Sequence, residues 1–336
     1  MNEKEKMEGS ELSEREGPPP VEQVKVKPDS TVLELIRSFS NMGFNAKRLA
    51  QACEIYEEMV RDSNCTKFFA LAGAMVPAGL QNVVVDLIRG GMIDVLVTTG
   101  ANLTHDLAEA LGHRHLQGHT ATGDVDDADL HDDQLNRIYD VFMPNRVYEA
   151  MEDFVKTLEF EAGTSVREFL RVLGKAEAEL PTCGDSILKA AWECDVPVFC
   201  PAFTDSGLGL QVMFHFRHAR LEFFDDLDAM VQRAWDANPA GVVIVGGGVP
   251  KNFTFQALQF SPTNAKYAVQ ITMDRPEPGG LSGAELREAI SWGKVHRNAK
   301  HVNLICDATI ALPLVLAYLK SVMPERFVEG GQSFSR

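Results

Sequence analysis

The stretch Gly241–Lys251 reads GVVIVGGGVPK, and it decides the fold class of this chain. Its first part, Val242–Val245, has the apolar, β-branched composition of a short buried strand. Three glycines follow directly, and Pro250 stands where the first turn of a helix would begin. A strand, a tight glycine turn and a helix in this order indicate one βα unit of a parallel sheet.

Five further runs of this kind occur along the chain. They are Lys67–Ala72, Ile93–Thr98, Pro197–Cys200, Tyr267–Ile271 and Val302–Cys306. Most are followed by small or polar residues and then by a helical pattern, which is typical of βαβ units covered on both faces. We therefore expect an α/β fold: a doubly wound, mostly parallel, Rossmann-like sheet of six or more strands with helical additions.

The domain organisation follows from composition and pattern. Residues 1–28 are charged and rich in proline, and we expect a disordered N-terminal extension. Residues 29–330 are expected to form a single α/β domain, with a helical insertion at about 105–193. A chain of 336 residues with 45% apolar residues can bury a core of this size.

Composition also limits the partners of the protein. The net charge of −16 argues against nucleic acid, which requires basic patches, and fits a cationic substrate. No apolar run reaches the length of about 18 residues that a membrane span needs, and the N-terminus lacks the apolar core of a signal peptide. The six cysteines show no C-x-x-C spacing. We therefore expect reduced thiols in a cytoplasmic protein.

Ligand sites of doubly wound sheets lie beyond the carboxyl ends of the strands. Small residues there would let a dinucleotide approach the main chain, and the helix after the glycines could bind phosphate at its N-terminus. No G-x-G-x-x-G motif or P-loop is complete, so glycines that serve only as tight turns are the alternative. The candidate cofactor contacts are Gly73, Ala74, Met75, Thr99, Gly100, Ala101, Asp205, Gly247, Met273, Asp307 and Ala308.

A second informative stretch is Leu281–Lys294, which reads LSGAELREAISWGK. Ser282 and Glu285 match the capping-box pattern S-x-x-E, which predicts the start of a helix. Gly293 is the kind of residue that ends one. The segment is therefore predicted to be a short helix with its own start and stop signals.

Three side chains on this segment carry a possible chemistry. Glu288 and Trp292 are four residues apart and share a helix face, and Lys294 follows at the terminus. A carboxylate and an aromatic ring can recognise an alkylammonium or guanidinium ion, and a deprotonated lysine can attack an imine carbon. The alternative is a solvated helix end with a core tryptophan and a surface lysine.

The sequence EAISWGK resembles the active-site signature of the deoxyhypusine synthase family, whose catalytic lysine closes that motif. The resemblance extends from about Lys67 to Leu319. It includes three further motifs, which are DVLVTTGAN at Asp94–Asn102, PVFCPAFTDSGLG at Pro197–Gly209 and GVVIVGGGVPK at Gly241–Lys251. The GGGVPKN and GGLSG motifs are more similar to a deoxyhypusine synthase-like branch than to the spermidine enzymes.

The resemblance implies a redox-neutral cycle with NAD as the cofactor. Hydride leaves a carbon beside an amine, the butyl fragment is held as an imine on a lysine, and hydride returns after an acceptor amine has displaced that lysine. Lys294 would be the catalytic nucleophile, with Trp292 along the alkyl chain, Glu288 on an amine and Asp205 on the cofactor. A homotetramer with its sites at dimer interfaces is also implied.

The departures from the family pattern concern the substrate. Leu281 and Leu210 stand where spermidine-binding synthases carry aspartates, and loss of two charged hydrogen bonds of about 1.5–3 kcal/mol each is too large for unchanged spermidine binding. Asn252 replaces a proton-accepting histidine and cannot act as an acid or base. A glutamate pair after V-T-T is replaced by Thr104 and His105.

We therefore expect the same reaction class with a different substrate. Asp274 and Glu277 could form a relocated anchor for a cation, and His105 or His119 could replace the missing histidine. The substrate-binding candidates are Glu288, Trp292, Asp274, His105 and Asn252.

The leading hypothesis is transfer of an aminobutyl or guanidinobutyl group from a polyamine-type or agmatine-type donor to a small amine. One alternative is a deoxyhypusine synthase that modifies a lysine of the initiation factor 5A precursor. Another is a noncatalytic NAD-binding scaffold. The His- and Asp-rich stretch 113–133 is interpreted as a polar loop, and we expect no metal site there.

Overall fold

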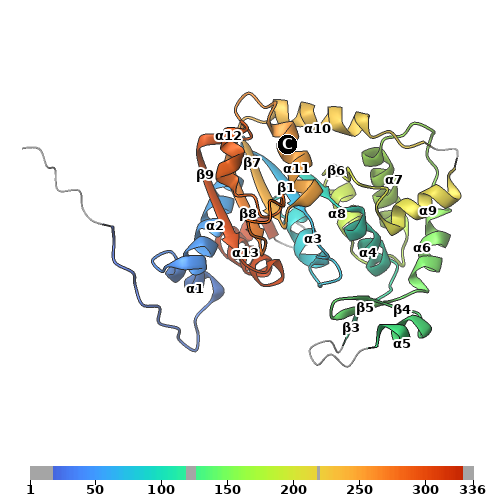
Figure 1. Cartoon of the computed structure of the whole chain (residues 1–336), viewed down its shortest axis with the longest axis horizontal. Helices are drawn as coiled ribbons and strands as arrows, with labels where there is room; N and C mark the ends of the chain where they lie inside the picture. The colour runs from blue at the N-terminus through green and yellow to red at the C-terminus, as the bar shows by residue number, and fades with distance from the viewer. Residues whose placement is uncertain (1–17, 119–125, 218–219, 328–336) are drawn as a thin grey trace, which may run out of the picture.

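A six-stranded parallel sheet forms the centre of the computed structural model, which describes residues 18–118, 126–217 and 220–327 (Figure 1). The strand order is β6-β2-β1-β7-β8-β9, and each neighbouring pair is parallel. Counted along the chain this is the order 3-2-1-4-5-6 of a Rossmann fold. The predicted fold class and all six predicted strands are confirmed. The strands are β1 (Thr66–Leu71), β2 (Val95–Thr98), β6 (Val198–Phe199), β7 (Ala240–Val245), β8 (Ala265–Thr272) and β9 (Val295–Ile305).

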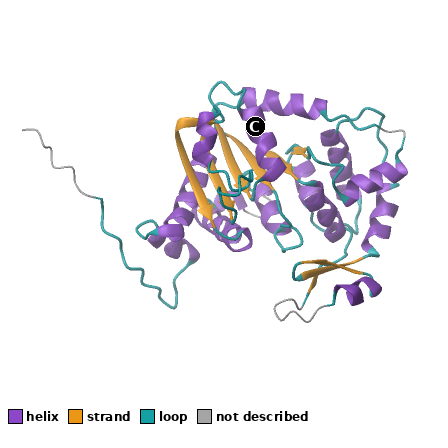
Figure 2. Cartoon of the chain, viewed as in Figure 1, coloured by secondary structure: helices purple, strands orange, loops and turns teal. Residues whose placement is uncertain are grey.

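Helices cover both faces of this sheet (Figure 2). Alternate residues of a strand point to opposite faces, so Phe69 and Leu71 enter one buried cluster while Phe68 and Ala70 enter the other. Helices α2, α3, α4 and α13 contribute to the first cluster, and α10, α11 and α12 to the second. The helices that flank the sheet directly are α2 (Phe44–Arg61), α3 (Gln81–Arg89), α4 (Gly100–Ala110), α10 (Phe224–Asp236), α11 (Gly248–Leu258), α12 (Leu286–Ser291) and α13 (Ala308–Val322).

The insertion at about 105–193 was expected to be helical, and it contains several helices together with strands that were not predicted. It contains a second, antiparallel sheet in the order β3-β5-β4. The turn between β4 and β5 places Tyr139 at φ 56°, a conformation that favours Gly, Asn or Asp, so the sequence carries no turn signal there. The elements of this region are β3 (Leu116–Gln117), α5 (Asp127–Asp132), β4 (Leu135–Ile138), β5 (Val141–Pro144), α6 (Val147–Val155), α7 (Val166–Glu179) and α8 (Ile187–Glu193).

The remaining elements lie at the ends of the domain and after β6. They are α1 (Val32–Phe39), α9 (Gly207–His215) and the 3-10 helix η2 (Pro324–Phe327). Residues 18–28 contain no helix or strand, whereas residues 1–17, on which most of the predicted disordered extension falls, lie outside the described residues. Within the three described ranges, none of the helices combines the length and apolar character needed to cross a membrane.

Candidate active site

The loops that follow the six strands meet at one edge of the sheet, because all strands run in the same direction. At the centre of this edge, Gly246 after β7 lies against Ala72 after β1. A β-carbon on Gly246 would be 3.3 Å from the main-chain oxygen of Ala72. Strands β1 and β7 are the pair at which the strand order reverses, where ligands bind in such sheets. The predicted cofactor contacts at the carboxyl ends are Gly73, Ala74 and Met75 after β1, Thr99, Gly100 and Ala101 after β2, Asp205 after β6, Gly247 after β7, Met273 after β8, and Asp307 and Ala308 after β9.

Two of these glycines allow protein segments to pack closely. A β-carbon on Gly100 would lie 2.5 Å from Cβ of Ser206, and one on Gly247 would lie 2.3 Å from Cα of Ser282. Both glycines are therefore required by contacts within the chain, independently of any ligand. Gly100 fixes the start of α4 against the loop after β6, and Gly247 fixes the start of α11 against the loop before α12.

The N-terminus of α11 fits the phosphate groups of a dinucleotide. Its N-cap residue is Gly247, so no side chain satisfies the amide groups of the first turn. At Gly248, with φ 55°, no atom lies within 4 Å of the position that a β-carbon would take. Free amides beside open space at a helix N-terminus are a common anion site. By contrast, Asp307 caps α13 through a hydrogen bond of 2.8 Å from the amide of Thr309.

Helix α12 carries the second group of candidate residues. It ends at Ser291 with Trp292 as the C-cap, and Gly293, with φ 65°, follows as the stop signal that the sequence predicts. The Nζ atom of Lys294 lies 5.1 Å from the ring centroid of Trp292, within range of a cation–π interaction. Glu288 is in the first turn and exposed, and Trp292 is 59% exposed. The alternative of a core tryptophan is wrong for this single chain.

The predicted capping box at Ser282 and Glu285 is not formed. The N-cap of α12 is Glu285, without a side-chain hydrogen bond, and the Ser282 hydroxyl donates to the carboxylate of Asp274. The main-chain oxygen of Ser282 accepts from Nε2 of Gln270 at 2.8 Å. Ser282 is therefore used to hold the loop 273–285, and the carboxylate of Asp274, a predicted cation anchor, already has one partner.

Lys251 is a site residue that the sequence motif contained but that was not singled out. It is 2% exposed, and its Nζ atom donates to Oε1 of Gln270 (3.0 Å) and to the main-chain oxygens of Leu281 (3.0 Å) and Ala284 (2.6 Å). Burial lowers the pKa of Lys251 to about 8, an effect that Glu288 opposes and the nearby charge of Lys294 reinforces. Lys251 thus clamps the loop that leads into α12.

The main chain of Lys294 lies at the amino ends of the strands, opposite the carboxyl ends that carry the cofactor candidates. Its oxygen accepts a hydrogen bond of 3.1 Å from the amide of Ala265, the first residue of β8, whereas Met273 follows the last residue of that strand. The seven steps between the first and last of the eight residues of β8, at about 3.3 Å each, put these two ends of the strand roughly 23 Å apart. Within one chain, the lysine and the cofactor loops therefore form two separate groups.

The other predicted substrate contacts belong to different elements. Asn252 is half-buried on α11, next to Lys251, and His105 is half-buried on α4. Nδ1 of His105 lies 2.8 Å from Nε2 of His115. His119 lies outside the described residues, which contain no group of three His, Cys, Asp or Glu side chains that could hold a metal ion.

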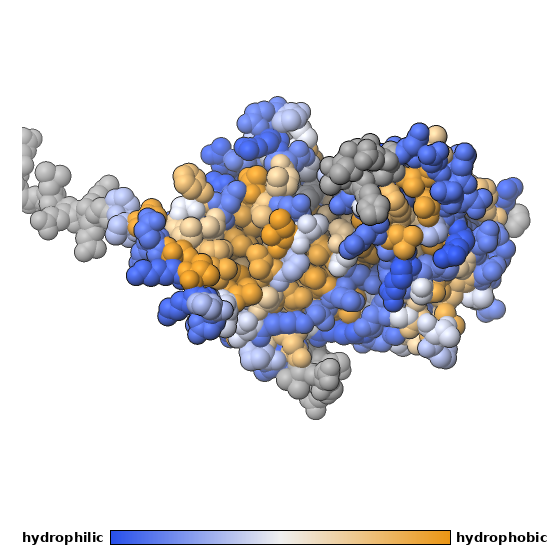
Figure 3. All heavy atoms as spheres, turned by 90° about the horizontal axis from the view of Figure 1, so that it is seen from below, coloured by the Kyte–Doolittle hydropathy of each residue, from blue (hydrophilic) through white to orange (hydrophobic). Residues whose placement is uncertain are grey.

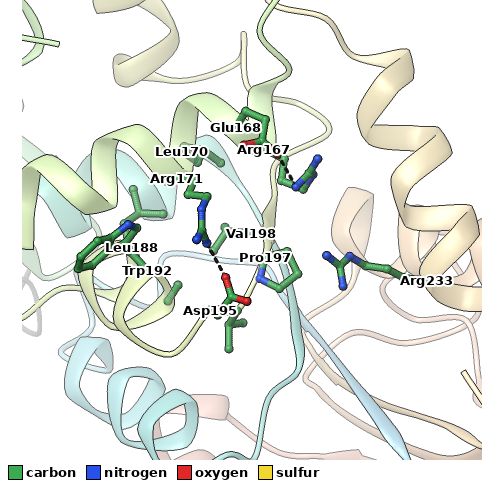
Figure 4. Close-up of a pocket in the computed structure, with 12 residues that line it drawn as sticks. Arg167, Glu168, Leu170, Arg171, Leu188, Trp192, Asp195, Pro197, Val198 and Arg233 are labelled. Atoms are coloured by element: carbon green, nitrogen blue, oxygen red, sulfur yellow. Dashed lines mark hydrogen bonds and ion pairs between the residues drawn. The ribbon is translucent and has the colours of Figure 1, made fainter. Parts of the chain in front are cut away.

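A cavity of about 210 Å³ lies at the amino end of β6, away from all of these residues (Figure 4). Arg171 and Asp195 face each other across it and form an ion pair of 2.7 Å. Arg167 pairs with Glu168 at 2.6 Å in the same wall. None of the predicted contacts lines this cavity, so it is not part of the candidate active site.

This chain is similar to several known proteins over most of its length. A relative from Methanosarcina acetivorans named probable deoxyhypusine synthase 1 is 43% identical over 321 residues, which cover 94% of this chain and 99% of the relative. A deoxyhypusine synthase-like protein from Chlorobaculum tepidum is 34% identical over 303 residues, which cover 85% of each chain. A solved structure of a candidate deoxyhypusine synthase from Entamoeba histolytica has the same fold, with a TM-score of 0.57, 16% identity and coverage of 88% of this chain and 94% of that one.

The family assignment follows from these matches. The family model for deoxyhypusine synthase matches residues 34–319, which contain the whole sheet and both groups of candidate residues. This chain belongs to the deoxyhypusine synthase family, whose members are NAD-dependent enzymes that transfer an aminobutyl group.

Proposed function

We propose that this protein transfers an aminobutyl or guanidinobutyl group from a polyamine-type or agmatine-type donor to an amine acceptor, through an imine on Lys294. The observation that carries the proposal is the position of Lys294 Nζ at 5.1 Å from the ring centroid of Trp292, with the exposed Glu288 four residues before Trp292 on α12. A lysine that must lose its proton to act as a nucleophile needs a site that does not stabilise its charge too strongly.

NAD, when bound, would take up and return the hydride. The residues that would hold it are the exposed Gly73 and Ala74 after β1, the exposed Ala101 after β2, and the uncapped start of α11, where Gly248 leaves open space for phosphate. Asp205 and Asp307 are exposed at the same edge, where carboxylates can accept hydrogen bonds from ribose hydroxyl groups. Trp292 would pack along the alkyl chain of the donor, and Glu288 would pair with one of its cationic ends.

A site shared between two copies of the chain reconciles the two groups of residues. Hydride transfer requires contact between cofactor and substrate, but the main chain of Lys294 and the cofactor loops lie at opposite ends of β8. Figure 3 views the carboxyl edge and shows apolar side chains gathered on it. Large apolar side chains are exposed in the loops and helix starts at this edge, which is typical of a protein interface. They are Val249, Met273, Leu281 and Ile310. These features support the homotetramer with sites at dimer interfaces that the family resemblance implies.

The proposed change of donor rests on the positions that differ from spermidine-binding synthases. Leu281 and Leu210 are 39% and 50% exposed, so both side chains are available to a substrate but cannot bind an ammonium group. Asp274, the proposed relocated anchor, is exposed and hydrogen-bonded to Ser282, and Glu277 is exposed in the same loop. A guanidinium end could bind both carboxylates through its several donors.

One observation favours a second candidate function. Relatives named probable deoxyhypusine synthase reach 43% identity over nearly the whole chain, against 34% for the relative named deoxyhypusine synthase-like protein. The alternative is therefore modification of a lysine on the initiation factor 5A precursor, with spermidine as donor. The six free cysteines, of which Cys53, Cys65 and Cys200 are buried, support a cytoplasmic location for either activity.

The test incubates the protein and NAD with agmatine, putrescine or spermidine, with and without the factor 5A precursor, and identifies products by mass spectrometry. Reduction with borohydride during turnover should trap the butyl fragment on the peptide that contains Lys294. Lys294→Ala should lose both the adduct and the product, whereas Lys300→Ala, a matched exposed lysine on β9, should keep both. Product formation by Lys294→Ala would refute the covalent role, and NAD binding without turnover of any amine would favour a noncatalytic scaffold. Light scattering that shows a monomer would refute the shared site.

A further inference from the structure

Three side chains form a hydrogen-bonded chain beside the predicted cofactor edge. The carboxylate of Glu109 accepts hydrogen bonds from the amide of His115 (2.9 Å) and from its ring atom Nδ1 (2.7 Å). The second ring nitrogen of His115, Nε2, lies 2.8 Å from Nδ1 of His105. Glu109 and His105 belong to α4, whereas His115 immediately precedes β3. The insertion therefore brings a third group to two residues that share a face of one helix.

The chemistry of these groups determines where the protons lie. Burial tends to raise the pKa of Glu109, but hydrogen bonds from His115 and Arg114 outweigh it and hold that pKa below its usual value. Glu109 is thus a carboxylate that only accepts, so Nδ1 of His115 carries a proton. In neutral His115 the atom Nε2 then has a lone pair, and it accepts from Nδ1–H of His105. This leaves Nε2 of His105 as the free acceptor at the end of the chain.

The free end of the chain is accessible and close to the cofactor loops. Nε2 of His105 makes no hydrogen bond within the described residues, and it is not among their buried atoms without a partner, so it reaches the surface. Ala101, a predicted cofactor contact, is exposed and lies four residues earlier on α4, on the same helix face. A proton accepted by His105 would therefore come from a molecule at the cofactor edge.

We propose that Nε2 of His105 accepts the proton that the ammonium group of the donor must lose before hydride can leave, and that Glu109 and His115 are positioning residues for it. This inference rests on the proposed function and adds a proton acceptor to it. Asn252, at the position where the family resemblance implies a histidine, cannot take this role.

The step balances as a proton relay with no redox change in the protein. The N–H bond of the donor ammonium breaks, and a bond forms between that proton and Nε2 of His105. The Nδ1 proton of His105 passes to Nε2 of His115, which becomes an imidazolium ion beside the Glu109 carboxylate. The positive charge that leaves the substrate thus ends next to a fixed negative charge.

This relay explains how a half-buried histidine can act as a base. Burial lowers the pKa of His105 to about 4, with a further decrease from His115 that Glu109 partly offsets, so a charge confined to His105 would be unfavourable. Transfer of the charge to His115 places it instead on a ring whose Nδ1 atom lies 2.7 Å from the Glu109 carboxylate. Helix α4 also packs on α6, α8 and α9, but their titratable groups do not affect the pKa of His105. These groups are Tyr148, Glu149, Glu152 and Asp153 on α6, Lys189 and Glu193 on α8, and His215 on α9.

The test measures NADH formation in a single turnover across pH, with NAD and whichever of agmatine, putrescine or spermidine the wild type uses. His105→Gln should slow this step by about 100- to 10,000-fold, the usual contribution of a positioned base. Imidazole in the buffer should restore part of the rate, which it would not do if His105 were only structural. Glu109→Gln should lower the plateau and move the acidic limb of the profile to lower pH, because the imidazolium ion loses its counter-charge.

Controls separate this inference from the proposed function. His301→Gln, on the far edge strand β9, should match the wild type, and the thermal midpoints of all variants report folding. A His105→Gln variant with the wild-type rate and pH profile overturns the proton acceptor while leaving the proposed function intact. Glu109→Gln with a slower rate but an unmoved acidic limb overturns the relay. Failure of the wild type to form NADH with any donor overturns both the proposed function and this role.

Discussion

Replacement of Lys251 by methionine tests whether the buried lysine clamps the loop before α12. Its Nζ atom donates to three oxygen atoms, on Gln270, Leu281 and Ala284. Hydrogen bonds from a charged donor contribute about 1.5–3 kcal/mol each, so loss of three costs roughly 4.5–9 kcal/mol. Methionine also removes a desolvation cost, because a pKa lowered from 10.5 to about 8 corresponds to roughly 3.4 kcal/mol. The difference predicts a net destabilisation of about 1–6 kcal/mol.

The assay is urea-induced unfolding followed by circular dichroism, together with hydrogen exchange of the amides in residues 281–284. Lys251→Met should lower the free energy of unfolding within this range and increase exchange in the loop. The matched control is Lys175→Met on α7, an exposed lysine whose replacement should change the free energy of unfolding by no more than about 0.5 kcal/mol. A Lys251→Met variant that is as stable as this control, with unchanged exchange in the loop, would refute the clamp.

Three further predictions follow from particular contacts. Burial, and then the neighbouring Asp106, raise the pKa of Glu177, so the folded state holds a proton that the unfolded state releases. The free energy of unfolding should therefore fall as pH rises from the usual glutamate pKa through the raised value. Glu177→Gln should remove this fall in thermal unfolding scans. Gly247→Ala places a β-carbon 2.3 Å from Cα of Ser282, so we expect a loss of at least about 1–3 kcal/mol in denaturant unfolding, and an unchanged midpoint would contradict the packing. Leu281→Asp should lower KM for spermidine relative to agmatine in steady-state assays while leaving stability unchanged; an unaltered ratio of the two KM values would exclude this position from donor selection.

The sequence predicted the sheet because its strands are buried and carry a continuous apolar signal. It failed where burial is incomplete. Strand β9 begins at Val295, before the apolar run that starts at Val302. It is an edge strand, and most of its first half is exposed and polar, so the sequence gives no apolar signal for that part. The antiparallel sheet of the insertion was missed for a similar reason, since β3, β4 and β5 are short and largely exposed or half-buried.

Local signals were also ambiguous at the candidate site. Among the described residues the pattern S/T-x-x-E occurs at Thr31, Ser165 and Ser282. Thr31 forms a full capping box with Glu34 and Ser165 caps α7, but Ser282 caps no helix. Ser282 has tertiary partners in Asp274 and Gly247, and these contacts override the local preference. The contact of His105 with His115 could not be predicted either, because it depends on where the insertion folds back. Sequence spacing could place Glu288, Trp292 and Lys294 close together, since the three residues lie within one short segment, and the role of this group stays a prediction.

Under the proposed function, the clamp would let this site change its substrate and keep its chemistry. Lys251 holds the loop before α12 through main-chain oxygens, including that of Leu281, so the clamp is independent of which side chain stands at position 281. The side chain of Leu281 is exposed and makes no part of that contact. Substitution there can therefore replace a carboxylate by an apolar group without moving α12 or the lysine that follows it. By contrast, Ser282 packs against Gly247 and its hydroxyl donates to Asp274, so a substitution of Ser282 would displace the loop. Specificity can thus vary at one position of the loop because the adjacent main chain, and not that side chain, fixes the geometry of Lys294.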